Sequence, residues 1–138
     1  MTSPTLKRET KHIIIKLNLN GTLVRALIDT GSKLDLITEN AAKMAGSRRQ
    51  TLAKPIAVRL ALRGKSLDRV IFRHFVNATL HNPKSGLAFD DVPLRIGHID
   101  GDYKLIVGTN FLKQFNLFPS ILHRLLHCNQ TKININDY

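Results

Sequence analysis

The amino-acid sequence predicts a mainly β domain with one or two short helices. An apolar, β-branched run ends at Asn20-Gly21, the strongest short hairpin signal in the chain, and apolar residues alternate with other residues after Pro55. A chain of 138 residues is also long enough to bury one hydrophobic core. We therefore expect a flexible basic segment at residues 1–11 and a single domain over residues 12–138.

Two strands are expected around the Asn20-Gly21 turn. Residues 11–19 would form the first strand and residues 22–28 the return strand. The return strand ends just before Asp29, so it would deliver this carboxylate to a loop.

A short helix is expected after Thr38. This residue is a suitable N-cap, Glu39 is favourable in the first helical turn, and Gly46 marks the end. The basic residues 47–50 would then form a loop.

The next two predicted strands form a long hairpin. Pro55 opens the first strand, a turn follows at residues 63–66, residues 70–80 form the second strand, and residues 82–86 form a further turn. The apolar positions on one face of the first strand are Ile56, Val58, Leu60 and Leu62.

Two more strands and a helix are predicted in the C-terminal half. The strands, at residues 89–99 and 103–107, are separated by a break at residues 100–102. Thr109 would cap a helix that continues through Phe115.

The pattern after residue 116 is ambiguous. Pro119 interrupts it, residues 121–126 fit either a helix or a strand, and residues 132–136 alternate as a strand would.

Asp29 has the most unusual surroundings of any charged residue. It follows Leu27 and Ile28 and precedes a second apolar run, so its carboxylate would be partly desolvated and would need donors or a counter-charge. Residues 30–32 supply two hydroxyls and three backbone amides. The same Asp-Thr-Gly-Ser stretch is also typical of an Asx turn. The residue types alone leave both interpretations open.

Three segments resemble motifs of one protein family. Residues 26–37 read Ala-Leu-Ile-Asp-Thr-Gly-Ser-Lys-Leu-Asp-Leu-Ile and resemble the active-site motif of aspartic proteases. Residues 105–112 read Leu-Ile-Val-Gly-Thr-Asn-Phe-Leu and resemble the later motif of retroviral-type proteases. Residues 55–66 resemble the flap of proteases from gypsy-type LTR retrotransposons, especially fungal ones. The resemblance covers residues 12–118.

The resemblance implies a retropepsin-like fold, a closed β-barrel monomer that is active as a two-fold dimer. The chain is short and holds one Asp-Thr-Gly, which excludes a bilobed single-chain enzyme, so the site would combine Asp29 from two copies. The expected catalytic residues are Asp29, Thr30 and Gly31. By resemblance, Thr30 would hydrogen-bond across the two-fold axis, and Ser32 would donate to the Asp29 carboxylate.

The resemblance also implies the residues that bind substrate. Gly31 would let the substrate backbone approach closely, and residues 62–66 would close over an extended peptide. The expected substrate-binding residues are Ser32, Lys33, Leu62, Arg63, Gly64 and Lys65, and Ile106, Val107 and Gly108 would support the catalytic loop from below. Lys33 departs from the family pattern, which has a small, acidic or amide residue at this position.

The sequence thus predicts an aspartic endopeptidase that uses an Asp29 dyad and an activated water, processes a retrotransposon polyprotein and needs no cofactor. Its partners would be a second copy of the chain and an extended peptide or polyprotein. The alternative is a catalytically silent retropepsin-like module that dimerises or binds peptide or nucleic acid. Lys33 and the net charge of +11 favour this alternative slightly, whereas the intact Asp29-Thr30-Gly31 favours the enzyme.

Composition sets further expectations. The positive charge is spread along the chain, which indicates at most a weak, non-specific contact with nucleic acid. A single cysteine, Cys128, fits a reducing compartment such as the cytoplasm, and the apolar runs are too short to span a membrane. His123 and His127 have the spacing of a helical metal pair, but no nearby carboxylate completes a ligand set, so no metal is predicted.

Overall fold

The computed structural model describes residues 13–60, 68–120 and 122–135, which form strands and two short helices. The main sheet contains β1 Ile13–Leu19, β2 Thr22–Ile28, β3 Leu36–Ile37, β4 Gln50–Leu60, β5 Asp68–His81, β6 Ala88–Ile96 and β7 Leu105–Val107. The helices are α1 Glu39–Met44 and α2 Thr109–Gln114, and the last strands are β8 Leu117–Ser120, β9 Leu125–Cys128 and β10 Ile133–Asn134. The predicted class, mainly β with one or two short helices, is confirmed. The predicted segment 1–11 lies outside the described residues.

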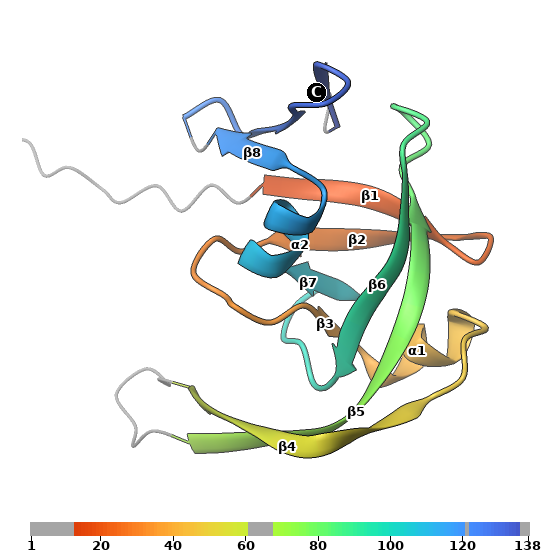
Figure 1. Cartoon of the computed structure of the whole chain (residues 1–138), viewed down its shortest axis with the longest axis vertical. Helices are drawn as coiled ribbons and strands as arrows, with labels where there is room; N and C mark the ends of the chain where they lie inside the picture. The colour runs from red at the N-terminus through yellow and green to blue at the C-terminus, as the bar shows by residue number, and fades with distance from the viewer. Residues whose placement is uncertain (1–12, 61–67, 121, 136–138) are drawn as a thin grey trace, which may run out of the picture.

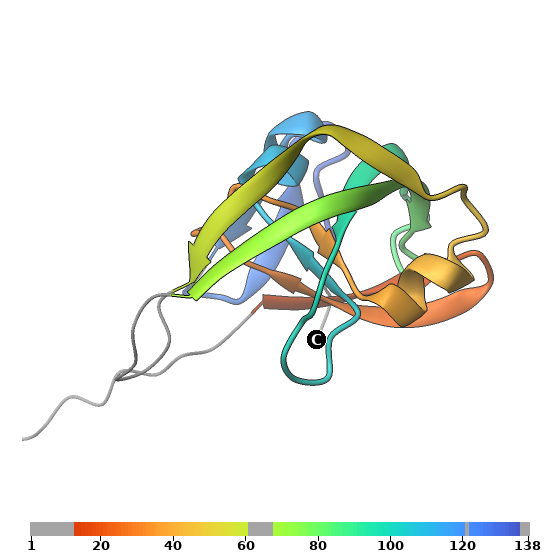
Figure 2. The ribbon, with the colours of Figure 1, turned by 90° about the horizontal axis from the view of Figure 1, so that it is seen from below.

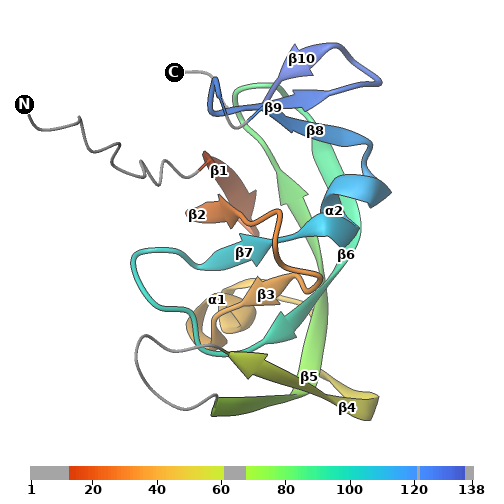
Figure 3. The same cartoon turned by 90° about the vertical axis from the view of Figure 1, so that its left-hand side faces the viewer.

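Seven strands form one curled sheet in the order β1-β2-β7-β3-β6-β5-β4 (Figures 1 and 3). Strand β7 runs parallel to β2, and β3 runs parallel to β6, whereas the other neighbours are antiparallel. The sheet curls far enough for β1 to pair also with β5, through Leu19 opposite Leu80. The parallel pair of β2 and β7 brings the carboxyl ends of both strands together.

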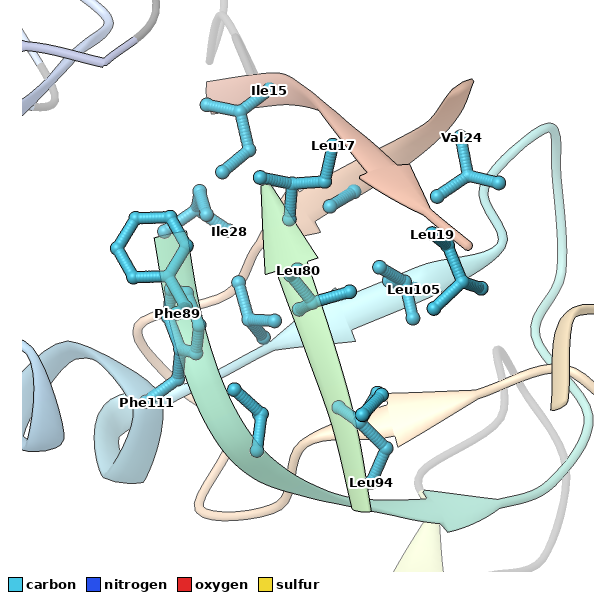
Figure 4. Packing of buried hydrophobic residues seen from close by; sticks show 14 of the residues in the cluster. Ile15, Leu17, Leu19, Val24, Ile28, Leu80, Phe89, Leu94, Leu105 and Phe111 are labelled. Atoms are coloured by element: carbon cyan, nitrogen blue, oxygen red, sulfur yellow. The ribbon is translucent and has the colours of Figure 1, made fainter. Parts of the chain in front are cut away.

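The hydrophobic core lies on the inner face of this sheet. Strand β1 alternates buried and less buried residues, which places Ile15, Leu17 and Leu19 inside. These side chains belong to the same buried cluster as Leu80 of β5 and Leu105 of β7 (Figure 4). The core therefore joins strands that are far apart in the sequence.

Three aromatic rings attach α2 to the sheet. Phe89 of β6 lies 5.1 Å from Phe111 of α2, measured between ring centroids, and 4.9 Å from Phe115 at the end of this helix. Tilted and edge-on arrangements of this kind are favourable for aromatic pairs. The cluster fixes α2, and with it the residue that precedes the helix, Gly108.

The first hairpin and the first helix are confirmed. Asn20 and Gly21 both have positive φ, 49° and 89°, as a two-residue hairpin turn of the primed type requires. The Thr38 hydroxyl accepts a hydrogen bond from the Ala41 N–H at 3.2 Å, so it caps α1 as expected. Gly46 follows the helix with φ of 68°.

The long hairpin is also confirmed, but its first strand begins earlier than predicted. Strands β4 and β5 run side by side across the molecule (Figure 2). Strand β4 starts at Gln50 and passes through Pro55, because the pairing register shifts between Thr51 and Ile56 and an edge strand tolerates a proline at such an irregularity. The predicted turn at residues 63–66 lies outside the described residues.

Three boundaries in the C-terminal half differ from the prediction. Strand β6 ends at Ile96, and β7 begins at Leu105. After β6 the chain turns closely under Phe72, whose Cε1 lies 2.4 Å from where a Cβ on Gly97 would be. Helix α2 is capped by Gly108 rather than Thr109, which is its first residue.

The ambiguous C-terminal region forms a second sheet in the order β10-β9-β8. Pro119 lies within β8, opposite Leu126 of β9, so it does not interrupt the strand. His127 lies in β9, where its Nδ1 is 3.1 Å from Oδ1 of Asn134. The helical spacing of His123 and His127 is therefore not realised, and the described residues hold no group of three metal-ligating side chains.

Both described helices contain six residues. A helix of this length cannot cross a bilayer, and the described residues hold none that is long and apolar enough to do so.

Candidate active site

Asp29 lies where two parallel strands end. Strand β2 pairs with β7 through Leu27 opposite Ile106 and Ile28 opposite Val107. The pairing continues one residue further, because the Asp29 N–H donates to the Val107 carbonyl at 2.9 Å. The backbone of Asp29 is thus fixed by β7, while its side chain is left for other contacts.

The carboxylate of Asp29 is exposed in the single chain. Its Oδ1 accepts a hydrogen bond from the Gly31 N–H at 2.9 Å, and the Ser32 N–H donates to the Asp29 carbonyl at 3.2 Å. This is the turn geometry that the Asx interpretation predicted. The expected desolvation of Asp29 is absent in the single chain: Ile28, just before it, points into the core, whereas the Asp29 side chain is exposed.

Gly108 can pack closely against this loop because it has no side chain. A Cβ on Gly108 would lie 2.2 Å from the Ser32 carbonyl oxygen, which belongs to the backbone and cannot rotate away. The same oxygen accepts hydrogen bonds from the Thr109 N–H at 2.9 Å and the Thr109 hydroxyl at 3.3 Å. The start of α2 therefore clamps the loop directly after Asp29.

Ser32 does not make the contact that the family resemblance implied. Its hydroxyl donates to the Leu34 carbonyl at 2.8 Å and accepts from the Leu34 N–H at 3.2 Å, so it stabilises the loop rather than the Asp29 carboxylate. The neighbouring Lys33 has an exposed side chain, and its carbonyl accepts from Nδ2 of Asn110 at 2.8 Å. Thr30 is exposed at the tip of the loop.

Asp35 is a site residue that the sequence reasoning missed. Its side chain is 1% exposed, and its Oδ1 accepts a hydrogen bond from the Gly108 N–H at 2.7 Å. Burial raises the pKa of this carboxyl, while the backbone N–H groups of Gly108 and Phe111 and the charge of Arg95 act in the opposite direction. The sequence signal that could have identified Asp35 is its position between Leu34 and the apolar Leu36-Ile37 pair.

The remaining predicted residues divide into two groups. Ile106, Val107 and Gly108 lie next to the loop that carries Asp29, on β7 and directly after it. Leu62, Arg63, Gly64 and Lys65 lie outside the described residues. The hairpin that leads to them, β4–β5, extends on the same side of the molecule as the loop at residues 29–35 (Figure 1).

Comparisons with known proteins show the fold. No protein-family model and no curated protein matches the sequence. Among solved structures, the retroviral protease-like domain of Ddi1 from Leishmania major is similar, with a TM-score of 0.62 and 17% sequence identity. The match covers 91% of this chain and 93% of that domain. The chain therefore has a retropepsin-like fold.

Proposed function

We propose that this chain is an aspartic endopeptidase whose active site combines Asp29 from two copies. The observation that carries the proposal is the exposed Asp29 carboxylate, set at the carboxyl ends of two parallel strands in a loop clamped by Gly108. In a retropepsin-like fold, one such loop supplies half of a catalytic pair. A two-fold axis beside the loop would bring the second half into place.

The proposed chemistry follows from placing two carboxylates side by side. At about 4 Å and an effective dielectric of about 20, two negative charges repel by roughly 4 kcal/mol, so the pair holds one proton between them. The ionised carboxylate takes a proton from a water, which attacks the scissile carbonyl carbon. The protonated partner donates to the carbonyl oxygen. Desolvation of Asp29, which the single chain lacks, would then arise in the dimer.

The substrate would be an extended peptide. Gly31 has no side chain beside Asp29, which permits close approach of a peptide backbone. The β4–β5 hairpin supplies an edge strand with free backbone groups, the usual partner for strand addition. The resemblance of residues 55–66 to the gypsy-type flap favours a retrotransposon polyprotein, processed in the cytoplasm, as the natural substrate.

Cleavage of a peptide library at mildly acidic pH tests the proposal. Asp29→Asn should abolish cleavage without affecting folding, since the exposed side chain keeps an oxygen for the Gly31 N–H. Asp90→Asn changes an exposed carboxylate on β6 in the same way and should cleave like the wild type. An inhibitor that mimics the tetrahedral intermediate should block the wild-type activity. Undiminished cleavage by Asp29→Asn would refute the proposal.

One observation favours a second candidate, a catalytically silent binding module. Lys33 places an exposed cation four residues after Asp29, in a chain of net charge +11, and this arrangement would suit a polyanion better than a catalytic pair. Binding of nucleic acid by such a module should fall steeply with salt and should be the same for wild type and Asp29→Asn. Absence of cleavage together with this binding behaviour would support the module.

A further inference from the structure

One row of side chains crosses the sheet on the face opposite the core. Strand pairing aligns Leu27 with Ile106, Ile106 with Leu36, Leu36 with Arg95, and Arg95 with Phe75. We call these five residues the outer row. All five are partly buried, and four of them are apolar, so Arg95 is the exception.

The outer row lies on the side of the sheet where Asp29 is presented. Side chains two residues apart along a strand point the same way, so Leu27 at the end of β2 and Asp29 just after it share a side. The neighbouring residues that point the other way are fully buried in the core, among them Val107, Ile37 and Leu94. The outer row therefore extends away from Asp29 across β7, β3, β6 and β5.

The Arg95 guanidinium is incompletely hydrogen-bonded among the described residues. Its Nε is buried and has no hydrogen-bond partner in the part of the chain that the structure describes. Asp35 interacts with Arg95 through its charge, and the Arg95 backbone N–H donates to the Asp35 carbonyl at 2.9 Å. The Asp35 carboxylate is engaged by the Gly108 N–H, and Asp35 points to the core side of β3, opposite the outer row. A buried guanidinium nitrogen without an acceptor is unfavourable. Arg95 as a whole is only partly buried, so an external acceptor that meets the exposed part of its side chain would be stabilising.

We propose that Arg95 is a specificity-determining residue that binds a carboxylate side chain of the substrate. The inference rests on the proposed function, because it assumes that a peptide lies over the outer row beside Asp29. Three strand spacings of about 4.8 Å separate Leu27 from Arg95, or about 14 Å, which an extended peptide spans in about four residues. The preferred substrate thus carries Glu or Asp within about four residues of the scissile bond. A guanidinium fork accommodates a carboxylate particularly well.

Paired peptides that differ only by Glu or Gln at each position test this inference. At one position, wild type should cleave the Glu peptide about 10- to 100-fold faster than the Gln peptide in kcat/KM, as expected for a hydrogen bond to a charged group. In Arg95→Met, which keeps an unbranched side chain of similar length, the ratio should fall to about one. Arg95→Lys keeps the charge without the planar fork and should keep part of the preference.

Two further variants show whether the effect belongs to Arg95. Lys84→Met removes a positive charge from the exposed turn between β5 and β6 and should keep the wild-type ratio. Lys33→Met removes the exposed cation nearest Asp29 in the sequence. If the preference is lost in Lys33→Met and kept in Arg95→Met, the inference is wrong. It is equally wrong if wild type shows no acidic preference, or if Arg95→Met leaves the preference unchanged.

A binding measurement separates this inference from the proposed function. If neither wild type nor any variant cleaves any peptide, the endopeptidase proposal fails. The same Glu and Gln pairs, displayed on an array and incubated with fluorescently labelled wild type and Arg95→Met, then test Arg95 directly. Retention of Glu peptides by wild type and not by Arg95→Met supports the inference, and equal retention of both members of each pair overturns it.

Discussion

The Asp35 carboxylate accepts a hydrogen bond from the Gly108 N–H at 2.7 Å, across 73 positions of sequence. This bond joins the segment after the Asp29 loop to the residue that clamps the loop. Asp35 directly precedes β3, and Gly108 is the N-cap of α2. The bond therefore fixes the segments before β3 and α2 relative to each other.

Removing this acceptor should destabilise the protein. Asp35→Ala leaves the buried Gly108 N–H without a partner, and we expect a loss of about 1–3 kcal/mol in the free energy of unfolding. Asp35→Asn retains a carbonyl oxygen in the same place and should lose less than about 1 kcal/mol. Urea denaturation of both variants measures these changes. Asp90→Ala, at an exposed position, should stay within about 0.5 kcal/mol of wild type, and an equal loss there would contradict the assignment.

The raised pKa of Asp35 predicts a pH dependence of stability. The folded protein holds the Asp35 proton more tightly than the unfolded chain, because burial outweighs the hydrogen bonds to the carboxylate. Protonated Asp35 therefore contributes to the free energy of unfolding. This contribution is fully present below the ordinary pKa of 3.8 and is lost as pH rises through the higher pKa of the folded state. Wild type should lose stability over this range relative to Asp35→Asn, which has no proton to release. If the free energies of unfolding of the two proteins changed in parallel with pH, the pKa of Asp35 would not be raised.

Local features of the fold could be predicted from the sequence because their causes are local. The Asn20-Gly21 turn needs two residues that adopt positive φ, and the Thr38 cap needs one hydroxyl at a helix start. Asp29 could be singled out for a similar reason, because the residues that place it in a turn follow it directly.

The contact of Asp35 and the position of Arg95 could not be predicted, because both depend on strand register. Asp35 meets Gly108, and Arg95 joins the outer row, only when β3 lies between β6 and β7. Alternation within one strand does not specify which strand lies beside it. Pro55 was misplaced for a related reason, since the irregularity that accommodates it exists only in the paired hairpin.

The close approach of Gly108 to Ser32 predicts that Gly108 cannot be replaced. In Gly108→Ala the new methyl group would lie 2.2 Å from a backbone oxygen, so we expect a loss of about 3 kcal/mol in unfolding free energy. Gly31→Ala is the matched substitution within the loop, where the nearest atom is 3.3 Å away in the exposed Asp29 side chain, and it should cost less than about 1 kcal/mol. Thermal or urea denaturation measures both. Equal stability of the two variants would contradict the clamp.

The proposed pairing of Asp29 from two copies predicts that cleavage depends on protein concentration. If each active site contains both copies, the cleavage rate per chain should fall on dilution below the dissociation constant of the dimer, and the loss should follow the dimer fraction measured by sedimentation. Two copies joined in one polypeptide by a flexible Gly/Ser linker should resist this loss, because the linker raises the effective concentration of the second copy. Within the joined protein, Asp29→Asn in one copy alone should abolish cleavage, since each site would hold one carboxylate. A constant rate per chain from a protein that sediments as a monomer would show that a single Asp29 suffices.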